Sequence, residues 1–211
     1  MDAGLLPVKK LSEAKQRLSQ EFDPDQREEI SRALLSDALD LCEKTPFLRW
    51  SIVTADAEAA ADARRRGLVV VDDPGAGLNA ALAAGIQEAR AAGAGSITII
   101  PVDVPLATAE DVHDLFDTGA TSDVALAPSH SDGGTNALYL SPPDALRPRF
   151  GPASLRAHLD EGHAAGLRCS ILDLSRLAID IDTPEDAREV AKEGGSSRTA
   201  QLLQRLLEPR S

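Results

Sequence analysis

Short apolar runs rich in valine and isoleucine alternate along the chain with longer amphipathic segments. This alternation is typical of βα units, in which buried strands and covering helices follow one another. It predicts an α/β fold with a mostly parallel central sheet flanked by helices. The expected strands are 3–8, 50–54, 68–71, 96–101, 124–127, 137–140 and a segment near 169–172.

Apolar residues at helical spacing predict several helices between and after these strands. The clearest is the helix that contains Leu78, Leu82 and Ile86, and the same spacing appears over 30–41. The Thr183-Pro184 pair, followed by acidic residues, predicts a helix that begins at Pro184. After a glycine-serine break, a closing helix is expected at about 197–208, with an apolar stripe that suits either the core or a homodimer interface.

Length and charge limit the class of protein. The 211 residues suit a single domain spanning 1–211, and 22 basic residues against 34 acidic ones give a net charge of −12. A surface of this sign repels nucleic acid and anionic membranes. The two distant cysteines suggest neither a disulfide framework nor a zinc site. With no visible export signal and no apolar run of roughly 20 residues, we expect a cytoplasmic protein.

A basic segment follows the first predicted strand, which ends in Pro7 and Val8. Lys9, Lys10, Lys15 and Arg17 place four cations in nine positions of an otherwise acidic chain. In open α/β sheets, ligands collect beyond the carboxyl ends of strands. The segment therefore suits a triphosphate, and a solvated basic turn is the alternative.

Carboxylates follow the strand at 96–101 and precede the helix at Pro184. Asp103 comes directly after the strand, and Asp180 and Asp182 alternate in an extended segment, where residues i and i+2 point the same way. Oxygen ligands of this kind suit Mg2+. The alternative for the second group is that Asp182 or Thr183 caps the helix.

Glycine-containing turns supply further candidate contacts. Gly77 and Asn79 open the clearest helix and could receive an anion or a base edge, or could simply cap it. The turn at 132–136 offers Thr135, and Gly151 and Ser154 lead into another helix start that could bind phosphate. A hairpin turn and a capped helix are the respective alternatives.

The remaining candidates for catalysis are weaker. His158 and His163 lie five positions apart, which misses the i, i+4 spacing of two metal ligands on one helix face, so we expect no zinc. His158 could steady the segment around Ser154 or could be structural. No nucleophile elbow is present, which disfavours covalent catalysis.

Six segments taken together resemble the 2-phospho-L-lactate or phosphoenolpyruvate guanylyltransferase family. They are PVKKLSEAKQRLS (7–19), GLNAAL (77–82), PVDVPL (101–106), DGGTNAL (132–138), FGPASLRAH (150–158) and DIDTPED (180–186). The family acts in coenzyme F420 biosynthesis and belongs to a wider Rossmann-like nucleotidyltransferase fold that includes molybdopterin guanylyltransferases. The resemblance covers the chain up to about residue 190, and it departs from the common family pattern at Lys10 and Gln16.

The resemblance implies a reaction and roles for the candidate residues. GMP would pass from GTP to the phosphate of a small phosphorylated carboxylic acid, with release of diphosphate. The implied Mg2+ ligands are Asp103, Asp180 and Asp182; the implied nucleotide contacts are Pro7, Lys9, Lys15, Arg17, Gly77 and Asn79; the implied acid contacts are Thr135, Gly151 and Ser154. Asp103 and Lys9 would be the catalytic residues.

Other functions are compatible with parts of the same pattern. A related nucleotidyltransferase could act on a pterin or a sugar phosphate with the same scaffold. A glycosyltransferase would be expected to carry an aspartate pair at the strand end, where this chain has Asp103 followed by Val104. A non-catalytic nucleotide-binding protein could retain the fold without the reaction.

Overall fold

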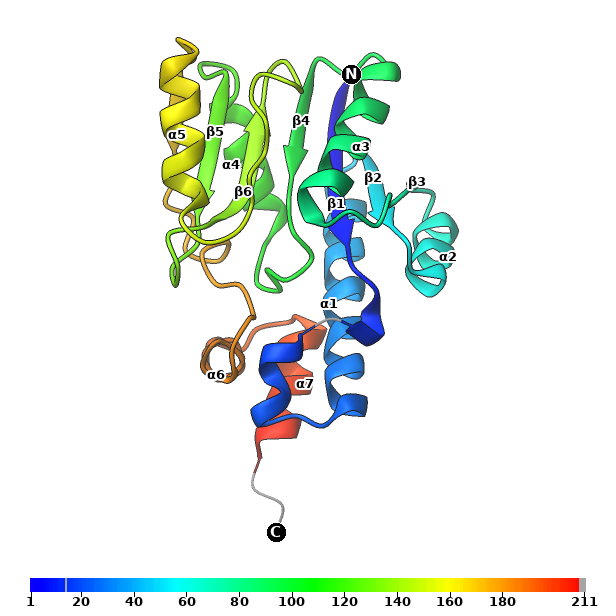
Figure 1. Cartoon of the computed structure of the whole chain (residues 1–211). Helices are drawn as coiled ribbons and strands as arrows, with labels where there is room; N and C mark the ends of the chain where they lie inside the picture. Colours follow the sequence, from blue (N-terminus) through cyan, green and yellow to red (C-terminus); the bar gives the residue numbers. More distant parts are fainter. Residues whose placement is uncertain (14, 209–211) are drawn as a thin grey trace.

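Seven strands form one sheet with the order β3-β2-β1-β4-β6-β5-β7. The structure is a computed structural model and describes residues 1–13 and 15–208 (Figure 1). The strands are β1 (Asp2–Val8), β2 (Arg49–Thr54), β3 (Val69–Asp72), β4 (Ser96–Ile99), β5 (Val124–Pro128), β6 (Thr135–Leu140) and β7 (Cys169–Ile171).

The sheet is parallel apart from β6, which runs antiparallel to both of its neighbours. This confirms the expected α/β fold with a mostly parallel sheet. Because β6 is reversed, its first residue lies at the same edge of the sheet as the carboxyl ends of β1, β4 and β5. Thr135 therefore begins its strand at the edge where ligands collect in open α/β sheets.

Two strand boundaries differ from the prediction in ways that affect the site. The strand expected at 96–101 ends at Ile99, since Pro101 has no N–H to continue the ladder. The strand expected at 137–140 begins at Thr135, which pairs with Pro128 across a register shift. Thr135 and Asn136 therefore belong to β6 and not to the preceding turn.

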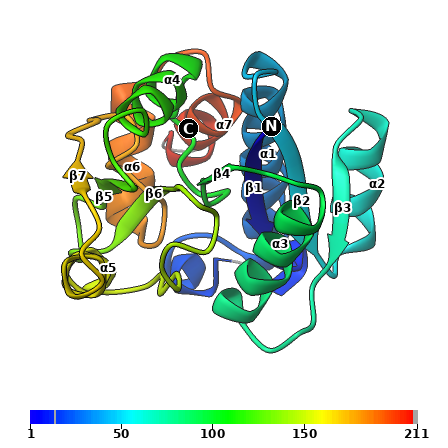
Figure 2. The same cartoon turned by 90° about the horizontal axis from the view of Figure 1, so that it is seen from above.

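Helices cover both faces of this sheet. They are α1 (Pro24–Lys44), α2 (Ala57–Arg65), α3 (Leu78–Ala91), α4 (Ala109–Thr118), α5 (Ser154–Ala164), α6 (Pro184–Glu193) and α7 (Arg198–Leu207), with 3-10 turns η1 (Leu11–Glu13) and η2 (Gln16–Gln20). The view along the strands shows α1 and α4 on one face and α3 and α5 on the other (Figure 2). No helix within the described ranges is both long enough and apolar enough to span a bilayer.

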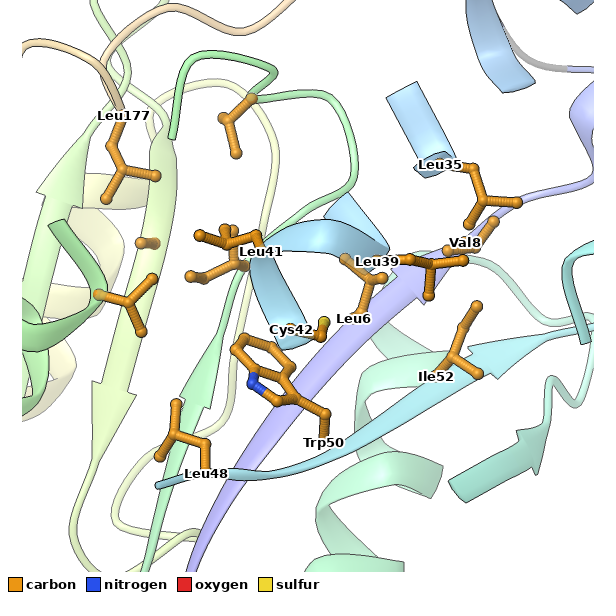
Figure 3. Close-up of a cluster of buried hydrophobic side chains, with 14 of the residues drawn as sticks. Leu6, Val8, Leu35, Leu39, Leu41, Cys42, Leu48, Trp50, Ile52 and Leu177 are labelled. Carbon is orange, nitrogen blue, oxygen red and sulfur yellow. The ribbon is translucent and has the colours of Figure 1, made fainter. Parts of the chain in front are cut away.

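Two hydrophobic clusters fill the space between the sheet and its helices. On the α1 face, Trp50 and Leu6 pack against Leu39 and Cys42 (Figure 3). The indole Nε1 of Trp50 donates to Thr45 Oγ1 over 2.9 Å, which satisfies its buried N–H. On the opposite face, α3 and α5 cover the other side chains of the same strands.

A third cluster lies beyond the carboxyl edge of the sheet. It joins η2, the first half of α1, the segment before α6, and α7 through Leu18, Leu34, Ile181 and Leu203, all of which are almost fully buried. The closing helix expected at about 197–208 is therefore confirmed as α7, and its apolar stripe packs within its own chain. The cluster holds η2 beside the 180–182 segment.

Candidate active site

A cavity of about 340 Å3 opens at the carboxyl edge of the sheet, between the β1 and β4 loops. Six of the residues predicted from the sequence line it: Pro7, Lys9, Lys15, Arg17, Asp103 and Asp182. Its other walls include Leu11, Leu34 and Leu78. The cavity thus has cations and carboxylates on an apolar base, as expected of a site for an anionic ligand with an aromatic or apolar part.

Asp103 lies in the loop that follows β4. Its backbone oxygen accepts a hydrogen bond from the Ile181 N–H over 3.0 Å. This contact ties the β4 loop to the segment that leads into α6. Two predicted acidic positions, far apart in the sequence, are thereby brought to one side of the cavity.

Lys15 connects the two acidic segments. Its side chain is 7% exposed, and its ammonium donates to Asp103 Oδ2 (2.8 Å), the Ile181 carbonyl oxygen (2.5 Å) and Asp182 Oδ1 (3.5 Å). Burial favours the neutral amine, but the neighbouring carboxylates outweigh it and raise the pKa of Lys15. The ammonium therefore stays protonated throughout the physiological range.

The other cations of the basic segment are more accessible. Arg17 is 71% exposed and donates to Asp182 Oδ2 over 3.3 Å, and Lys9 is exposed at the cavity wall. Lys10 does not line the cavity and pairs instead with Glu13, which does. Lys15 and Arg17, predicted as nucleotide contacts, thus face carboxylates predicted as metal ligands.

In the 180–183 segment, different residues cap α6 and face the cavity, a choice that the sequence left open. Thr183 is the N-cap of α6, and its side chain accepts from the Asp186 N–H. Asp182 is therefore free of capping and faces Lys15 and Arg17. The predicted helix start at Pro184 is confirmed.

Asp180 is held by a different set of partners. Its Oδ1 accepts from Ser129 Oγ and from Asn136 Nδ2, each over 2.9 Å. Burial raises the pKa of this carboxyl, and the negative charge of Asp103 raises it further. The two hydrogen bonds lower the pKa, but the net shift is upward. Although Asp180 and Asp182 alternate in an extended segment, they share no hydrogen-bond partner among the residues that the structure describes. Ser129 directly follows β5, so the strand-end rule that located Asp103 could have identified it.

The donor chemistry of this region fits Mg2+. Asp103 and Asp182 converge on one cationic nitrogen, that of Lys15, and all three carboxylates are hard oxygen donors of the kind Mg2+ prefers. As the side chains stand, no three His, Cys, Asp or Glu residues within 1–13 and 15–208 are arranged to hold a metal ion together. The lysine ammonium lies between the two converging carboxylates.

Thr135 and Ser154 form a second polar group on the α5 face of the sheet. Ser154 Oγ donates to Thr135 Oγ1 over 3.1 Å, and Thr135 Oγ1 lies 3.1 Å from His158 Nδ1. All three side chains are buried. The segment that carries Gly151 lies beside them, since the Ser154 N–H donates to the Gly151 carbonyl oxygen.

The start of α5 differs from the anion site expected from the sequence. The N–H groups of Ser154 and Leu155 already donate to Gly151 and Gly133. Gly151 itself has φ +126°, a conformation that favours glycine, and no atom would lie within 4 Å of an added Cβ. Open space beside Gly151 and the Thr135 hydroxyl are therefore the features available to a ligand here.

Gly77 and Asn79 lie at the start of α3, close to the same loop. Gly77 is the N-cap, with φ 92°, which is the capping alternative that the sequence left open, and Asn79 Oδ1 accepts from the Phe150 N–H over 3.2 Å. Asn79 therefore joins the start of α3 to the segment before Gly151. Neither residue lines the cavity, although Leu78 between them does.

The arrangement of elements is shared with a solved structure. A solved structure described as a putative nucleotide-diphospho-sugar transferase from Desulfovibrio desulfuricans G20 superposes with a TM-score of 0.79. The match covers 97% of this chain and 94% of that one, at 18% sequence identity. At this identity the likeness establishes the fold alone.

Other proteins have a higher sequence identity to this chain. The phosphoenolpyruvate guanylyltransferase of Sphaerobacter thermophilus is 38% identical over 89% of this chain and 91% of its own. The 2-phospho-L-lactate guanylyltransferase of Methanothermobacter thermautotrophicus is 32% identical over 96% of this chain and 90% of its own. The profile of the family described as "Guanylyl transferase CofC like" matches residues 3–208. This chain therefore belongs to the CofC-like guanylyl transferase family and is a nucleotidyltransferase.

Proposed function

We propose that this enzyme transfers GMP from GTP to the phosphate of phosphoenolpyruvate or 2-phospho-L-lactate, with release of diphosphate, in coenzyme F420 biosynthesis. The observation that carries the proposal is the cavity in which Lys9, Lys15 and Arg17 meet Asp103 and Asp182 at the carboxyl edge of the sheet. A site that joins two phosphorylated reactants needs cations to bind the phosphates and carboxylates to bind a metal ion. The relatives named for these two acceptors support the same reaction.

In the proposed reaction, a phosphate oxygen of the acid attacks the α-phosphorus of GTP. A new P–O bond forms there, while the bond from the α-phosphorus to the oxygen bridging to the β-phosphorus breaks and diphosphate leaves. The attacking phosphate is anionic at neutral pH, so no general base is required. The protein must therefore position two anions and neutralise their charge, which explains a site rich in lysine and arginine.

Side chains of this protein would bind the different parts of GTP. Lys9, exposed at the cavity wall, would contact the triphosphate, as would Arg17. Lys15 would lie between the phosphates and the carboxylates. Asn79 would donate from Nδ2 to a nucleobase carbonyl, since its Oδ1 already accepts from Phe150.

Mg2+ is the proposed cofactor, and Asp103, Asp180 and Asp182 would hold it. When bound, it would supply positive charge that offsets the negative charge of the phosphates. The acceptor would meet Thr135, Gly151 and Ser154. We further propose a cytoplasmic setting without nucleic-acid partners, in keeping with the net charge of −12.

An acceptor panel tests the proposal. Diphosphate release would be measured with GTP and Mg2+ plus phosphoenolpyruvate, 2-phospho-L-lactate or 3-phosphoglycerate, against a control without acceptor and a parallel series with ATP and CTP. We expect release that depends on one of the first two acceptors and is fastest with GTP. Release only with 3-phosphoglycerate, or with none of the three acids, would show that the proposed acceptors are wrong.

A further inference from the structure

We propose that His158 is a positioning residue that fixes the hydroxyl of Thr135 as a hydrogen-bond donor toward the acceptor substrate. The inference rests on the proposed function, which places the phosphorylated acid at Thr135. His158 itself is fully buried and would not touch the substrate. Its effect would be transmitted through one hydrogen bond.

The protonation of the imidazole follows from its backbone contact. The Arg149 N–H donates to His158 Nε2 over 2.8 Å. A backbone N–H can only donate, so Nε2 must carry a lone pair, and the neutral ring must carry its proton on Nδ1. Burial lowers the pKa of His158 to about 4, so the ring stays neutral at physiological pH.

This tautomer dictates the direction of the next hydrogen bond. Nδ1–H donates to Thr135 Oγ1 over 3.1 Å, and Ser154 Oγ donates to the same oxygen over 3.1 Å. A hydroxyl oxygen has two lone pairs, and both are then used. The remaining polar function of Thr135 is its own O–H donor, and no acceptor for it is present in the part of the chain that the structure describes.

The histidine also links the two segments that flank this hydroxyl. It contacts Thr135 at the start of β6 and Arg149 in the loop before Gly151, and its ring packs edge-on against Phe150 with centroids 5.8 Å apart. Thr135 is also linked to Gly151, since Ser154 Oγ donates to Thr135 Oγ1 and the Ser154 N–H donates to the Gly151 carbonyl oxygen. An oriented donor at the carboxyl edge of the sheet suits a carboxylate or phosphate oxygen.

Removing the ring should loosen this donor. In His158→Phe, the Thr135 hydroxyl loses one of its two donors, so its proton is no longer fixed in one direction. We expect the KM for the acceptor to rise about tenfold, the equivalent of one hydrogen bond to an anion, while the KM for GTP changes little. His158→Asn retains an N–H donor near the Nδ1 position and should recover most of the loss.

A double-variant cycle separates this effect from a general loss of structure. Thr135→Val removes the hydroxyl, so adding His158→Phe to it should raise the acceptor KM no further. Full additivity, or an unchanged acceptor KM in His158→Phe, would overturn the inference. A wild-type enzyme without acceptor-dependent diphosphate release would instead overturn the proposed function, and this inference with it.

The tautomer of His158 can be checked by NMR, without activity measurements or variants. In an 15N-labelled wild-type protein, the long-range 1H–15N NMR pattern of His158 should show a protonated Nδ1 and a bare Nε2 at neutral pH. Addition of the acceptor should leave that pattern in place. A proton on Nε2 would overturn the inference even if His158→Phe failed to fold.

Discussion

For single residues, the sequence showed which side chains follow the end of a strand. It did not show which other residues these side chains contact. Asp103 and Lys9 were identified because each follows an apolar strand. The contact between Lys15 and Asp103 spans 88 positions, and the backbone of Lys15 is left-handed (φ 55°). No local pattern encodes such a contact. Ser129, which holds Asp180, follows a strand in the same way as Asp103 and was missed.

The buried His158 makes a pH-dependent contribution to stability. Burial lowers its pKa to about 4, whereas an unfolded histidine titrates near 6.5; Glu161 and Arg149 have smaller, opposing effects. Between these two pKa values the unfolded chain binds more protons than the folded one. The contribution of the neutral His158 ring to the free energy of unfolding is therefore fully present above about pH 6.5 and is lost as the pH falls. We expect a loss of about 2 kcal/mol between pH 7 and pH 5.

Urea unfolding at the two pH values measures this contribution. His158→Asn lacks the titrating ring and serves as the matched control, since the other ionisable groups are unchanged. The variant should lose less stability than the wild type over the same interval. An identical loss in both proteins would mean that His158 is not the group responsible.

At the scale of elements, hydrophobic periodicity located every strand and the longest helices, but it could not reveal strand direction. The reversal of β6 places Thr135 at the ligand-binding edge, and this depends on pairing with β4 and β5 across the sheet. We predicted neither α2 nor α4. Both have readable N-caps: Asp56 accepts from the Glu58 and Ala59 N–H groups, and Thr108 forms a capping box with Asp111.

The pairing of β1 with β2 requires a glycine opposite a tryptophan. Gly4 lies directly across from Trp50, and a Cβ at Gly4 would lie 2.3 Å from an atom of the buried indole ring. The ring is rigid and packed on the α1 face. We therefore expect Gly4→Ala to destabilise the fold by roughly 1–3 kcal/mol through overpacking.

Chemical denaturation of Gly4→Ala beside a second glycine variant tests this packing argument. Gly95→Ala is the control, because an added Cβ there meets no atom within 4 Å. The control should change stability by less than about 0.5 kcal/mol. Equal effects of the two substitutions would contradict the close approach of Gly4 and Trp50.

At the scale of the whole molecule, the third hydrophobic cluster determines how the site is assembled. It packs the basic segment after β1 against the 180–182 segment through η2, α1 and α7. The sequence predicted a closing helix but left open whether it covered the core or a partner chain. Packing of Leu203 and Ala200 into this cluster answers that question, because periodicity specifies an apolar stripe and not what covers it.

The closing helix should therefore contribute to stability within one chain. Leu203 is fully buried, and Leu203→Ala should lower the free energy of unfolding by about 2–5 kcal/mol through lost burial and a cavity. Gln201→Ala, on the exposed side of the same helix, should have almost no effect. If protein concentration changed the effect of Leu203→Ala, the stripe would be packing against a second chain instead.

We expect Asp103 to belong to the site where guanylyl transfer takes place. The most direct test compares acceptor-dependent diphosphate release by the wild type and Asp103→Asn, with Asp144→Asn as the control because that carboxylate pairs with Arg90 on the surface. We predict that Asp103→Asn unfolds at a similar denaturant concentration but loses at least about 100-fold in kcat, while Asp144→Asn matches the wild type. Turnover by a folded Asp103→Asn protein at the wild-type rate would contradict the account.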